Sequence, residues 1–296
     1  MGLNERQLNF ISRCNRKADI QLVDDKWKTK VAMSVYRDFK INVPDTYLTV
    51  HQHRELSSLE AFLRSRPMLC QRSGLVIKPI QGWGGKGVLV LMERIDERHY
   101  RSADHMIYSI DDLLSHTREI LSGMYSLGGR RDGALVEELI HFSPDLKAYS
   151  RGGVPDIRIV LYQGTPISAM LRLATLHSHG CANLSKGGVG VGVNLETGET
   201  TYAVQFKKPV TLHPDTGLPL AGFKIPQWPR VLELAAHAAH VSKLGFCGVD
   251  IVLDTDNEPL LLELNARPGL AIQIANQRGH LPRTRLVDER MSGRID

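Results

Sequence analysis

The chain has 296 residues, of which 42% are hydrophobic and 23% charged, and no apolar run approaches the roughly 20 residues that cross a bilayer. Lys and Arg number 37 against 32 for Asp and Glu, without a long basic run, so neither a membrane nor a nucleic acid is expected as a partner. The sequence starts without a long apolar secretory segment, so we expect a cytoplasmic protein, with its oligomeric state left open. The scattered cysteines contain no C-x-x-C motif and are expected to be reduced: Cys14, Cys70, Cys181 and Cys247.

The first predicted lobe covers residues 24–140 and follows an N-terminal extension of residues 1–23. Residues 24–39 have an apolar residue at every fourth position, which predicts a helix that buries Trp27, Val31, Val35 and Phe39. Asp24 or Asp25 can cap its start. The other predicted elements are a turn and strand within residues 41–50, helices over 57–66 and 109–123, and strands over 74–80, 87–95 and 134–140.

The second predicted lobe covers residues 141–296 and again mixes strands with helices. Residues 155–175 predict a hairpin that turns at Gln163 and Gly164. The other predicted elements are a glycine-rich segment over 180–192, a helix over 229–245 that Gly245 ends, and a hairpin over 248–265. Together the two lobes predict the α+β fold class.

A glycine-rich loop follows the strand that contains Lys78. Gly82, Gly84 and Gly87 have the spacing G-x-G-x-x-G, but the next residues, VLVLM, favour a strand and not the helix of a dinucleotide-binding loop. Val88 after Gly87 excludes a Walker loop. A strand, a glycine flap and a strand remain, as in protein kinases and ATP-grasp enzymes, and the kinase motifs are missing. Such a flap places backbone N–H groups over phosphates, although an ordinary hairpin turn is the alternative.

The hairpin over residues 248–265 gathers acidic residues among apolar ones. Glu263 and Asn265 are two residues apart and therefore share a face of the strand. If Leu253 pairs with Leu260 across the turn, Asp250 faces Glu263, and like charges in that position destabilise a sheet. A bound Mg²⁺, which prefers oxygen ligands, would explain the arrangement. The alternative is that one carboxylate points to solvent at a sheet edge.

The motifs occur in a distinctive order along the chain. The lysine-led flap is followed by VEELI, DIR, MLR, NLSKGG, GVD and LELNARPG. This order resembles the ATP-grasp superfamily and, within it, the α-L-glutamate ligase-related proteins, relatives of the ribosomal-protein glutamate ligase. The similarity extends over nearly the whole chain and implies an ATP-grasp fold in which two α+β lobes hold ATP. The full domain that precedes these lobes in better-known glutamate ligases is expected to be missing here.

The resemblance implies a set of ligand-binding residues. Those implied for ATP are two lysines, the flap, the adenine hinge and polar residues of the second lobe: Lys26, Lys78, Gly82, Gly84, Gly85, Lys86, Gly87, Glu137, Glu138, Leu139, Ile140, Asp156, Arg158 and Asn183. Asp250, Glu263 and Asn265 match the ligands of one or two Mg²⁺ ions, which Mn²⁺ can replace. For Asp156, a simple salt bridge to Arg158 is the alternative.

The resemblance further implies an ADP-forming ligase that makes an amide through an acyl phosphate. Arg172 and Lys186 would neutralise the transferred phosphoryl group, and Arg267 would bind the acceptor carboxylate. An ordinary ion pair is the alternative for each arginine. The partners implied are a peptide or small acid and an amino acid, which is glutamate by family resemblance. Arg267 in NARPG departs from the family pattern and indicates a different anionic substrate.

Two other functions are compatible with the same motifs. An ATP-grasp protein can phosphorylate a small molecule without forming an amide. It can also be a nucleotide-binding module without catalysis, although such a module would not need all three metal ligands.

Overall fold

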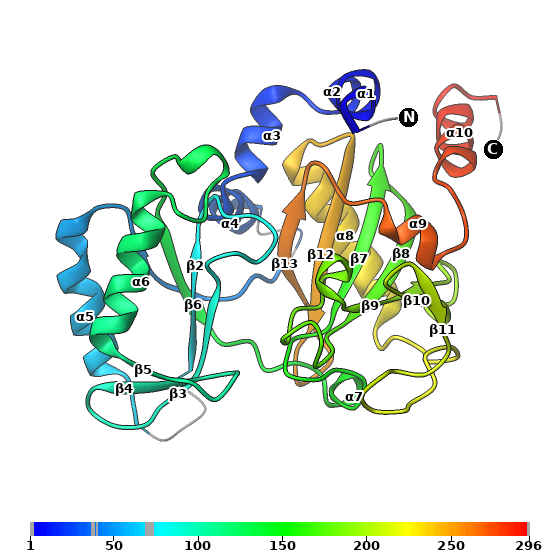
Figure 1. The fold of residues 1–296 in the computed structure, drawn as a ribbon. Helices are drawn as coiled ribbons and strands as arrows, with labels where there is room; N and C mark the ends of the chain where they lie inside the picture. Colours follow the sequence, from blue (N-terminus) through cyan, green and yellow to red (C-terminus); the bar gives the residue numbers. More distant parts are fainter. Residues whose placement is uncertain (1–2, 37–38, 40, 69–73, 295–296) are drawn as a thin grey trace. The chain divides into compact units, whose positions relative to one another are not determined.

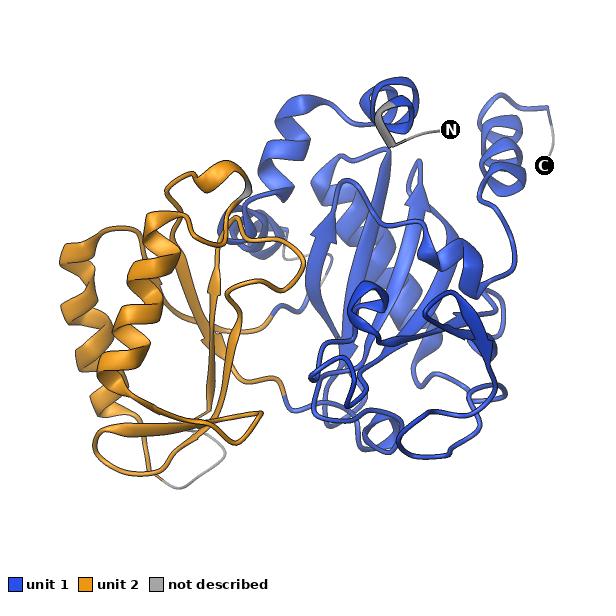
Figure 2. Ribbon diagram, viewed as in Figure 1, with its two compact units in different colours: residues 1–43, 141–296 blue, residues 44–140 orange. Residues whose placement is uncertain are grey.

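The computed structural model describes residues 3–36, 39, 41–68 and 74–294, so Cys70 lies outside the described residues. The chain forms two compact units, shown in different colours in Figure 2: unit 1 contains residues 1–43 and 141–296, and unit 2 contains residues 44–140. Each unit combines an antiparallel sheet with helices (Figure 1), which is the predicted α+β class. None of the helices in the described part is long and apolar enough to cross a membrane.

Unit 2 is built on a six-stranded sheet with strand order β1-β6-β2-β3-β4-β5. Its strands are β1 (Thr46–Val50), β2 (Leu75–Pro79), β3 (Leu89–Arg94), β4 (His99–Ser102), β5 (Ile107–Ser109) and β6 (Ala134–Glu138). Its helical segments are η3 (His53–Glu55), α5 (Leu56–Ser65), α6 (Ile110–Ser122) and η5 (Leu127–Gly129). Ile77 and Val136 face α5 and α6 in the apolar core, so Lys78 and Glu137 occupy the opposite face of the sheet.

Helix α6 shows how the local sequence sets the limits of an element. The Ser109 side chain accepts a hydrogen bond from the backbone of Asp112, whose carboxylate accepts one from the backbone of Ser109 in return. Gly123 ends the helix with a φ of 87°, and a Cβ there would lie 2.2 Å from the carbonyl oxygen of Arg130. Both predicted ends of this helix are confirmed.

Unit 1 is built on a seven-stranded sheet with strand order β11-β10-β9-β8-β7-β12-β13. Its strands are β7 (Asp156–Tyr162), β8 (Thr165–Leu173), β9 (Val189–Val193), β10 (Thr200–Gln205), β11 (Lys208–Val210), β12 (Phe246–Leu253) and β13 (Pro259–Asn265). Its helical segments are α1 (Leu3–Arg6), η1 (Gln7–Ile11), α2 (Ser12–Cys14), α3 (Lys17–Val23), α4 (Lys26–Val35), α7 (Pro144–Lys147), η6 (Leu184–Lys186), α8 (Trp228–Ser242), α9 (Ala271–Ala275) and α10 (Leu281–Met291).

The two faces of the unit 1 sheet differ in chemistry. One face is apolar along its length, and residues such as Ile157, Ile159 and Val249 pack against α8, α3 and α4. The other face is divided along the strands. Val160 and Met170 belong to an apolar half that packs with residues from η1, α9 and α10, and a charged half contains the residues that the sequence singles out.

The N-terminal residues join unit 1 because they pack on its sheet and on α8. The side chain of Asn15 bonds to the backbone N–H and carbonyl of Phe246, at the start of β12. Phe39 stacks on His237 of α8, and the carbonyl of Asn42 accepts a bond from the backbone of Leu261 in β13. Residues 24–43, expected in the first lobe, are therefore part of the same compact unit as the second.

Two predicted helices differ from those in the structure. Asp25 caps α4 as predicted, but Val31 and Val35 are exposed, and the helix buries Thr29, Lys30 and Met33 instead. The predicted apolar stripe is wrong because α4 buries the opposite face, which contains Thr29 and Met33. Helix α8 ends at Ser242, followed by Lys243 with a left-handed φ of 57°, and does not continue to Gly245.

Candidate active site

The acidic hairpin of unit 1 has Asp250 directly opposite Glu263, as predicted. The predicted register near the turn is wrong, however, because Leu253 pairs with Pro259 and not with Leu260. A β-bulge removes this offset of one residue before Asp250 is reached. Ile251 pairs with Leu261 and Asp250 pairs with Glu263, so Leu262 is the extra residue of the bulge. The bulge therefore brings Glu263 to the face of Asp250.

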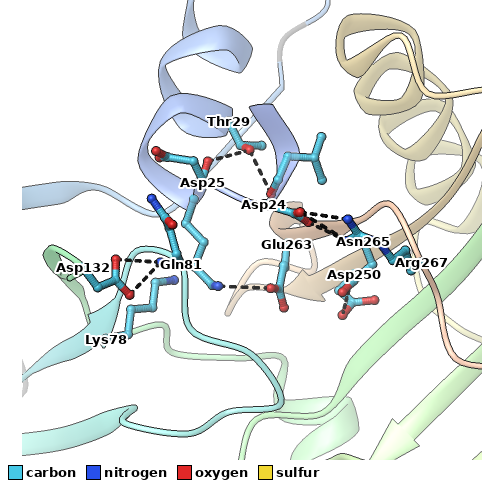
Figure 3. Close-up of polar contacts among 12 residues, drawn as sticks. Asp24, Asp25, Thr29, Lys78, Gln81, Asp132, Asp250, Glu263, Asn265 and Arg267 are labelled. Carbon is cyan, nitrogen blue, oxygen red and sulfur yellow. Dashed lines mark hydrogen bonds and ion pairs between the residues drawn. The ribbon is translucent and has the colours of Figure 1, made fainter. Parts of the chain in front are cut away.

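Asp250 is the centre of an ion-pair network on the charged half of the sheet. Arg158 on β7 donates to both of its carboxylate oxygens, over 2.7 and 2.5 Å. Arg172 on β8 reaches the same carboxylate over 2.7 Å and bonds to Asp156 over 2.5 Å. Asn265 on β13 adds a weaker bond of 3.3 Å to Asp250 (Figure 3). The network joins side chains of four adjacent strands.

The partners within this network follow the strand pairing. Asp156 is opposite Arg172 on β8, and Asp250 is opposite Arg158 on β7. The salt bridge considered between Asp156 and Arg158 is wrong, because cross-strand neighbours approach more closely than residues two apart on one strand. In this structure Arg172 forms ion pairs with Asp156 and Asp250, which was the alternative to a role at the phosphoryl group.

Burial and ion pairing act in opposite directions on the two acids. Asp156, Arg172 and Asp250 are all nearly inaccessible to water, at 6%, 6% and 2% exposure. Burial raises the pKa of Asp156 to about 6, although Arg172 opposes the rise. Burial also acts to raise the pKa of Asp250, but the ion pairs with Arg158 and Arg172 outweigh it and hold that pKa below its ordinary value. Asp250 is thus firmly ionised, with two guanidinium groups balancing two carboxylates.

Two further ion pairs lie at the edge of the sheet formed by β13. The Lys26 ammonium at the start of α4 lies 3.3 Å from Glu263, and the Asp25 side chain caps the helix at this end. Arg267, just after β13, forms a bidentate pair with Asp24 over 3.0 to 3.2 Å. Both partners of this second pair are about half exposed, so water screens their attraction.

The loop that contains Asn183 and Lys186 is shaped by its own hydrogen bonds. The Asn183 side chain caps η6 by accepting a bond from the backbone of Ser185, and the Lys186 side chain is exposed. Gly187 has a φ of 99°, and a Cβ there would lie 2.5 Å from the His177 ring. Among the described residues, neither Asn183 nor Lys186 forms a hydrogen bond or ion pair with the Asp250 network.

Unit 2 contains the predicted lysine of the flap, and this lysine is paired with a predicted hinge residue. The Lys78 ammonium forms an ion pair with the Glu137 carboxylate, and both side chains are at least nine-tenths buried. Val76, two residues before Lys78, is opposite Glu137, so the two charged side chains are diagonal neighbours on one face. Glu138 instead accepts a bond from the backbone of Asp45, while Leu139 is buried and Ile140 is half-buried.

The glycine loop after β2 has the backbone conformations that its glycines allow. Gly84, Gly85 and Gly87 have φ values of 62°, 71° and 70°, which most other residues avoid. At Gly82 the backbone forms an isolated bridge to Ser126. The ammonium of Lys86 lies 4.6 Å from the centre of the Trp83 ring, a cation–π contact at the exposed tip.

Asp132 anchors this loop, and no sequence pattern identified it as a site residue. Its buried carboxylate accepts a bond from the backbone N–H of Gln81 over 3.0 Å (Figure 3). It accepts another from the Ser126 hydroxyl over 2.6 Å. It also accepts a bond from the backbone of Gly133. The only sequence signal was an acid beside a glycine before a strand, which is too common to single out.

The residues expected to bind Mg²⁺ fit the ion unequally. Among residues 3–36, 39, 41–68 and 74–294, no group of three or more His, Cys, Asp and Glu side chains is arranged to hold a metal ion. Glu263 and Asn265 offer oxygen donors on one face, and Glu263 remains 36% exposed. The carboxylate of Asp250 is instead occupied by Arg158 and Arg172. Glu263 and Asn265 therefore have oxygen donors of the kind that Mg²⁺ prefers, but Lys26 already pairs with Glu263, and Asp250 would first have to lose an arginine.

Comparison with protein families identifies the fold. The sequence model of the family described as sugar-transfer associated ATP-grasp matches residues 5–289. The chain belongs to this family. The ATP-grasp fold expected from the motifs is thus confirmed, and the narrower relationship to α-L-glutamate ligase-related proteins is not. A comparison with curated protein sequences gave no match.

Solved structures of other ATP-grasp proteins resemble the chain more distantly. D-cycloserine synthetase DcsG is 16% identical, with a TM-score of 0.47 over 92% of this chain and 78% of its own. D-alanine–D-alanine ligase from Bacillus anthracis is 14% identical, with a TM-score of 0.46 over 86% of this chain and 62% of its own. The ATP-grasp ligase PsnB, in complex with a minimal precursor, is 13% identical, with a TM-score of 0.44 over 88% of this chain. The chain spans 57% of the length of PsnB.

Proposed function

We propose that this ATP-grasp protein is an ATP- and Mg²⁺-dependent ligase that joins a carboxylate to an amine. The observation that carries the proposal is the pair of opposed acids, Asp250 and Glu263, with Asn265 beside them. Arg158 and Arg172 already compensate Asp250, and Lys26 pairs with Glu263, so a Mg²⁺ brought by ATP would bind first to the exposed oxygen donors of Glu263 and to Asn265. We propose further that the amine is an amino acid such as glutamate and that the acid is a peptide or a small acid.

The proposed reaction needs little covalent chemistry from the protein. A carboxylate oxygen attacks the γ-phosphorus of ATP, ADP leaves, and the amine nitrogen then attacks the acyl carbon as phosphate leaves and the nitrogen loses a proton. A Mg²⁺ ion held by Glu263 and Asn265, with Asp250, would neutralise charge on the phosphates. We assign Arg172 and Lys186 to the transferred phosphoryl group, because both add positive charge where negative charge develops.

Residues of both units are proposed to bind the nucleotide. In unit 2 these are Lys78, the glycine loop over residues 82–87 and the segment 137–140, whose backbone would meet the adenine. In unit 1 they are Lys26, Asp156, Arg158 and Asn183. Backbone N–H groups in left-handed glycine conformations can approach phosphate oxygens without a Cβ in the way, which supports the assignment of the loop.

The exposure of the ion pairs supports different roles for two arginines. The pair between Arg267 and Asp24 is about half exposed, and such pairs contribute about 1 kcal/mol or less. Arg267 can therefore exchange Asp24 for the carboxylate of a substrate at little cost. Arg172 is buried between two carboxylates, so its positive charge would be fixed in place and would not exchange a partner for a ligand.

A turnover screen tests the proposal. The full chain is incubated with MgATP and a matrix of small acids, dipeptides and amino acids, and ADP, phosphate and product mass are measured. Sugar acids and amino sugars belong in the matrix because the family is described as sugar-transfer associated. We expect ADP and phosphate only when an acid and an amine are both present, and repeating the screen with Mn²⁺ tests the choice of ion. ADP release with an acid or alcohol alone, giving a stable phosphorylated product, would instead identify a kinase.

A matched pair of variants tests the metal assignment. Glu263→Gln should abolish turnover and leave the fold intact, because an amide keeps the size and loses the charge. Glu258→Gln is the control, since Glu258 lies in the turn of the same hairpin and pairs with Arg230. Full activity of Glu263→Gln would refute the role of this carboxylate.

A further inference from the structure

Unit 1 contains a cavity of about 220 Å³ away from the Asp250 network. It is lined by residues of the strands β8, β9 and β10 and of the segment that connects α9 to α10. Ser168 and Thr201 line it from the sheet, Asn276, Arg278 and His280 line it from the connecting segment, and Arg283 lines it from the first turn of α10. Ser168 is buried and Arg278 is exposed, so the cavity opens to solvent and reaches down to the sheet.

The cavity gathers positive charge that the protein does not neutralise. In the described part of the chain, neither Arg278 nor Arg283 has an ion pair with an acidic side chain. Burial and the nearby Arg278 lower the pKa of Arg283, and only Glu196 acts in the other direction. Two guanidinium groups and one carboxylate leave an excess of one positive charge on the lining.

One further feature of the lining favours an anion. The cavity lies at the N-terminal end of α10, an 11-residue helix whose first N–H groups and dipole attract negative charge. The N-terminus of α10 and the two arginines therefore attract negative charge to the same part of the lining.

We propose that this cavity binds a small molecule with a carboxylate or phosphate group, at a site distinct from that of ATP. About 220 Å³ is below the range of roughly 300 to 1,000 Å³ in which drug-sized ligands bind, so a small acid fits and a nucleotide does not. The guanidinium groups of Arg278 and Arg283 would bind the anion, because arginine donates to carboxylate and phosphate oxygens in a fixed, planar geometry.

The cavity is separated from the charged network within unit 1. Ser168 lies four residues before Arg172 on β8, which is roughly 13 Å along a strand. Helix α9 packs between these points, since a Cβ on Gly192 of β9 would lie 2.3 Å from the carbonyl oxygen of Ala275. Occupation of the cavity therefore does not depend on the proposed ligase reaction.

Thermal unfolding of the full chain tests the site. The melting temperature is measured against increasing inorganic phosphate and, separately, succinate, with ionic strength held constant by sodium chloride. A ligand that binds only the folded state gives a saturable rise. We expect such a rise with one or both probes, and the probe that gives it tells whether the site prefers phosphate or carboxylate.

Three variants assign the effect to the cavity. Arg283→Gln should weaken the apparent affinity on the order of tenfold or more, because it removes a charged hydrogen-bond donor. Arg278→Gln tests the same prediction if the first variant does not fold. Arg285→Gln is the control, since Arg285 is an exposed residue of α10 outside the cavity. No saturable rise with either probe, or wild-type affinity in both cavity variants, overturns the proposal.

Discussion

The glycine loop of unit 2 and the charged face of the unit 1 sheet are assigned to the same ligand, but they are built in different ways. The loop depends on local backbone conformation, with three glycines at positive φ and one buried acid, Asp132, holding its base. The charged face depends on the pairing of strands that are distant in the sequence, because Asp250 contacts Arg158 and Arg172. A backbone site should tolerate most side-chain changes, whereas a network of buried charges should not.

Removing Arg172 should have the largest effect. Arg172→Met leaves Asp156 with no guanidinium partner and Asp250 with one fewer in a buried setting, and breaking a buried pair in this way costs about 3–5 kcal/mol. Urea denaturation measures the loss. Arg267→Gln breaks only an exposed pair with Asp24 and should cost about 1 kcal/mol or less. Equal losses in the two variants would contradict the contrast between buried and exposed pairs.

A pH titration extends the comparison to another buried group of unit 1. Burial, with Arg6 nearby, lowers the pKa of His280 to about 4, below the value of about 6.5 in an unfolded chain. Between these values the unfolded state binds more protons, so His280 stabilises the fold above pH 6.5 and loses this contribution as the pH falls towards 4. The difference in unfolding free energy between wild type and His280→Gln should change by up to about 3 kcal/mol over this window. A constant difference would contradict the prediction.

The anchor of the loop should matter more than any side chain at its tip. Asp132→Ala leaves the backbone N–H of Gln81 and the hydroxyl of Ser126 without their acceptor, and should cost about 2–3 kcal/mol. The affinity for ATP should fall as well, because the loop loses its fixed position. Calorimetric titration with ATP measures this. Unchanged affinity in a folded Asp132→Ala protein would show that the loop does not need its anchor.

Two glycine substitutions provide the smallest and most selective test. Both Gly84 and Gly87 have positive φ, so alanine is strained at each by about 1 kcal/mol. Only at Gly87 would the new Cβ meet another group, the Tyr125 ring at 2.5 Å, which raises the expected cost to about 2 kcal/mol. Chemical denaturation of the two variants compares the costs. A larger loss for Gly84→Ala would contradict the described loop conformation.

The sequence predicted the local features well and the long-range partners poorly. The cap at Ser109, the stop at Gly123 and the turn at Gln163 and Gly164 follow from residues within a few positions of each other. The ion pairs do not, because choosing Arg158 as the partner of Asp250 requires the register of β7 against β12, which no local pattern gives. Asp132 was missed for the same reason, since its partner Gln81 is 51 residues away.

The hairpin of β12 and β13 shows both outcomes at once. Alternation along β13 correctly placed Glu263 and Asn265 on one face, and Asp250 does face Glu263. The straight register expected near the turn was wrong, because a bulge depends on packing of the whole sheet and not on the sequence of one hairpin. Among the site residues, the metal ligands and the nucleotide contacts remain predictions, since their assignment requires the ligand.

Leu262, the extra residue of the β-bulge, affects how the sequence of this hairpin is aligned with those of other hairpins. Deleting it would give a straight ladder in which Asp250 and Glu263 are still opposite, because Ile251 and Leu261 already pair on one side of it. Hairpins that differ by one residue in length can therefore present the same two acids. Counting positions from the turn would misalign such chains, and only superposition of the strands themselves reveals equivalent carboxylates.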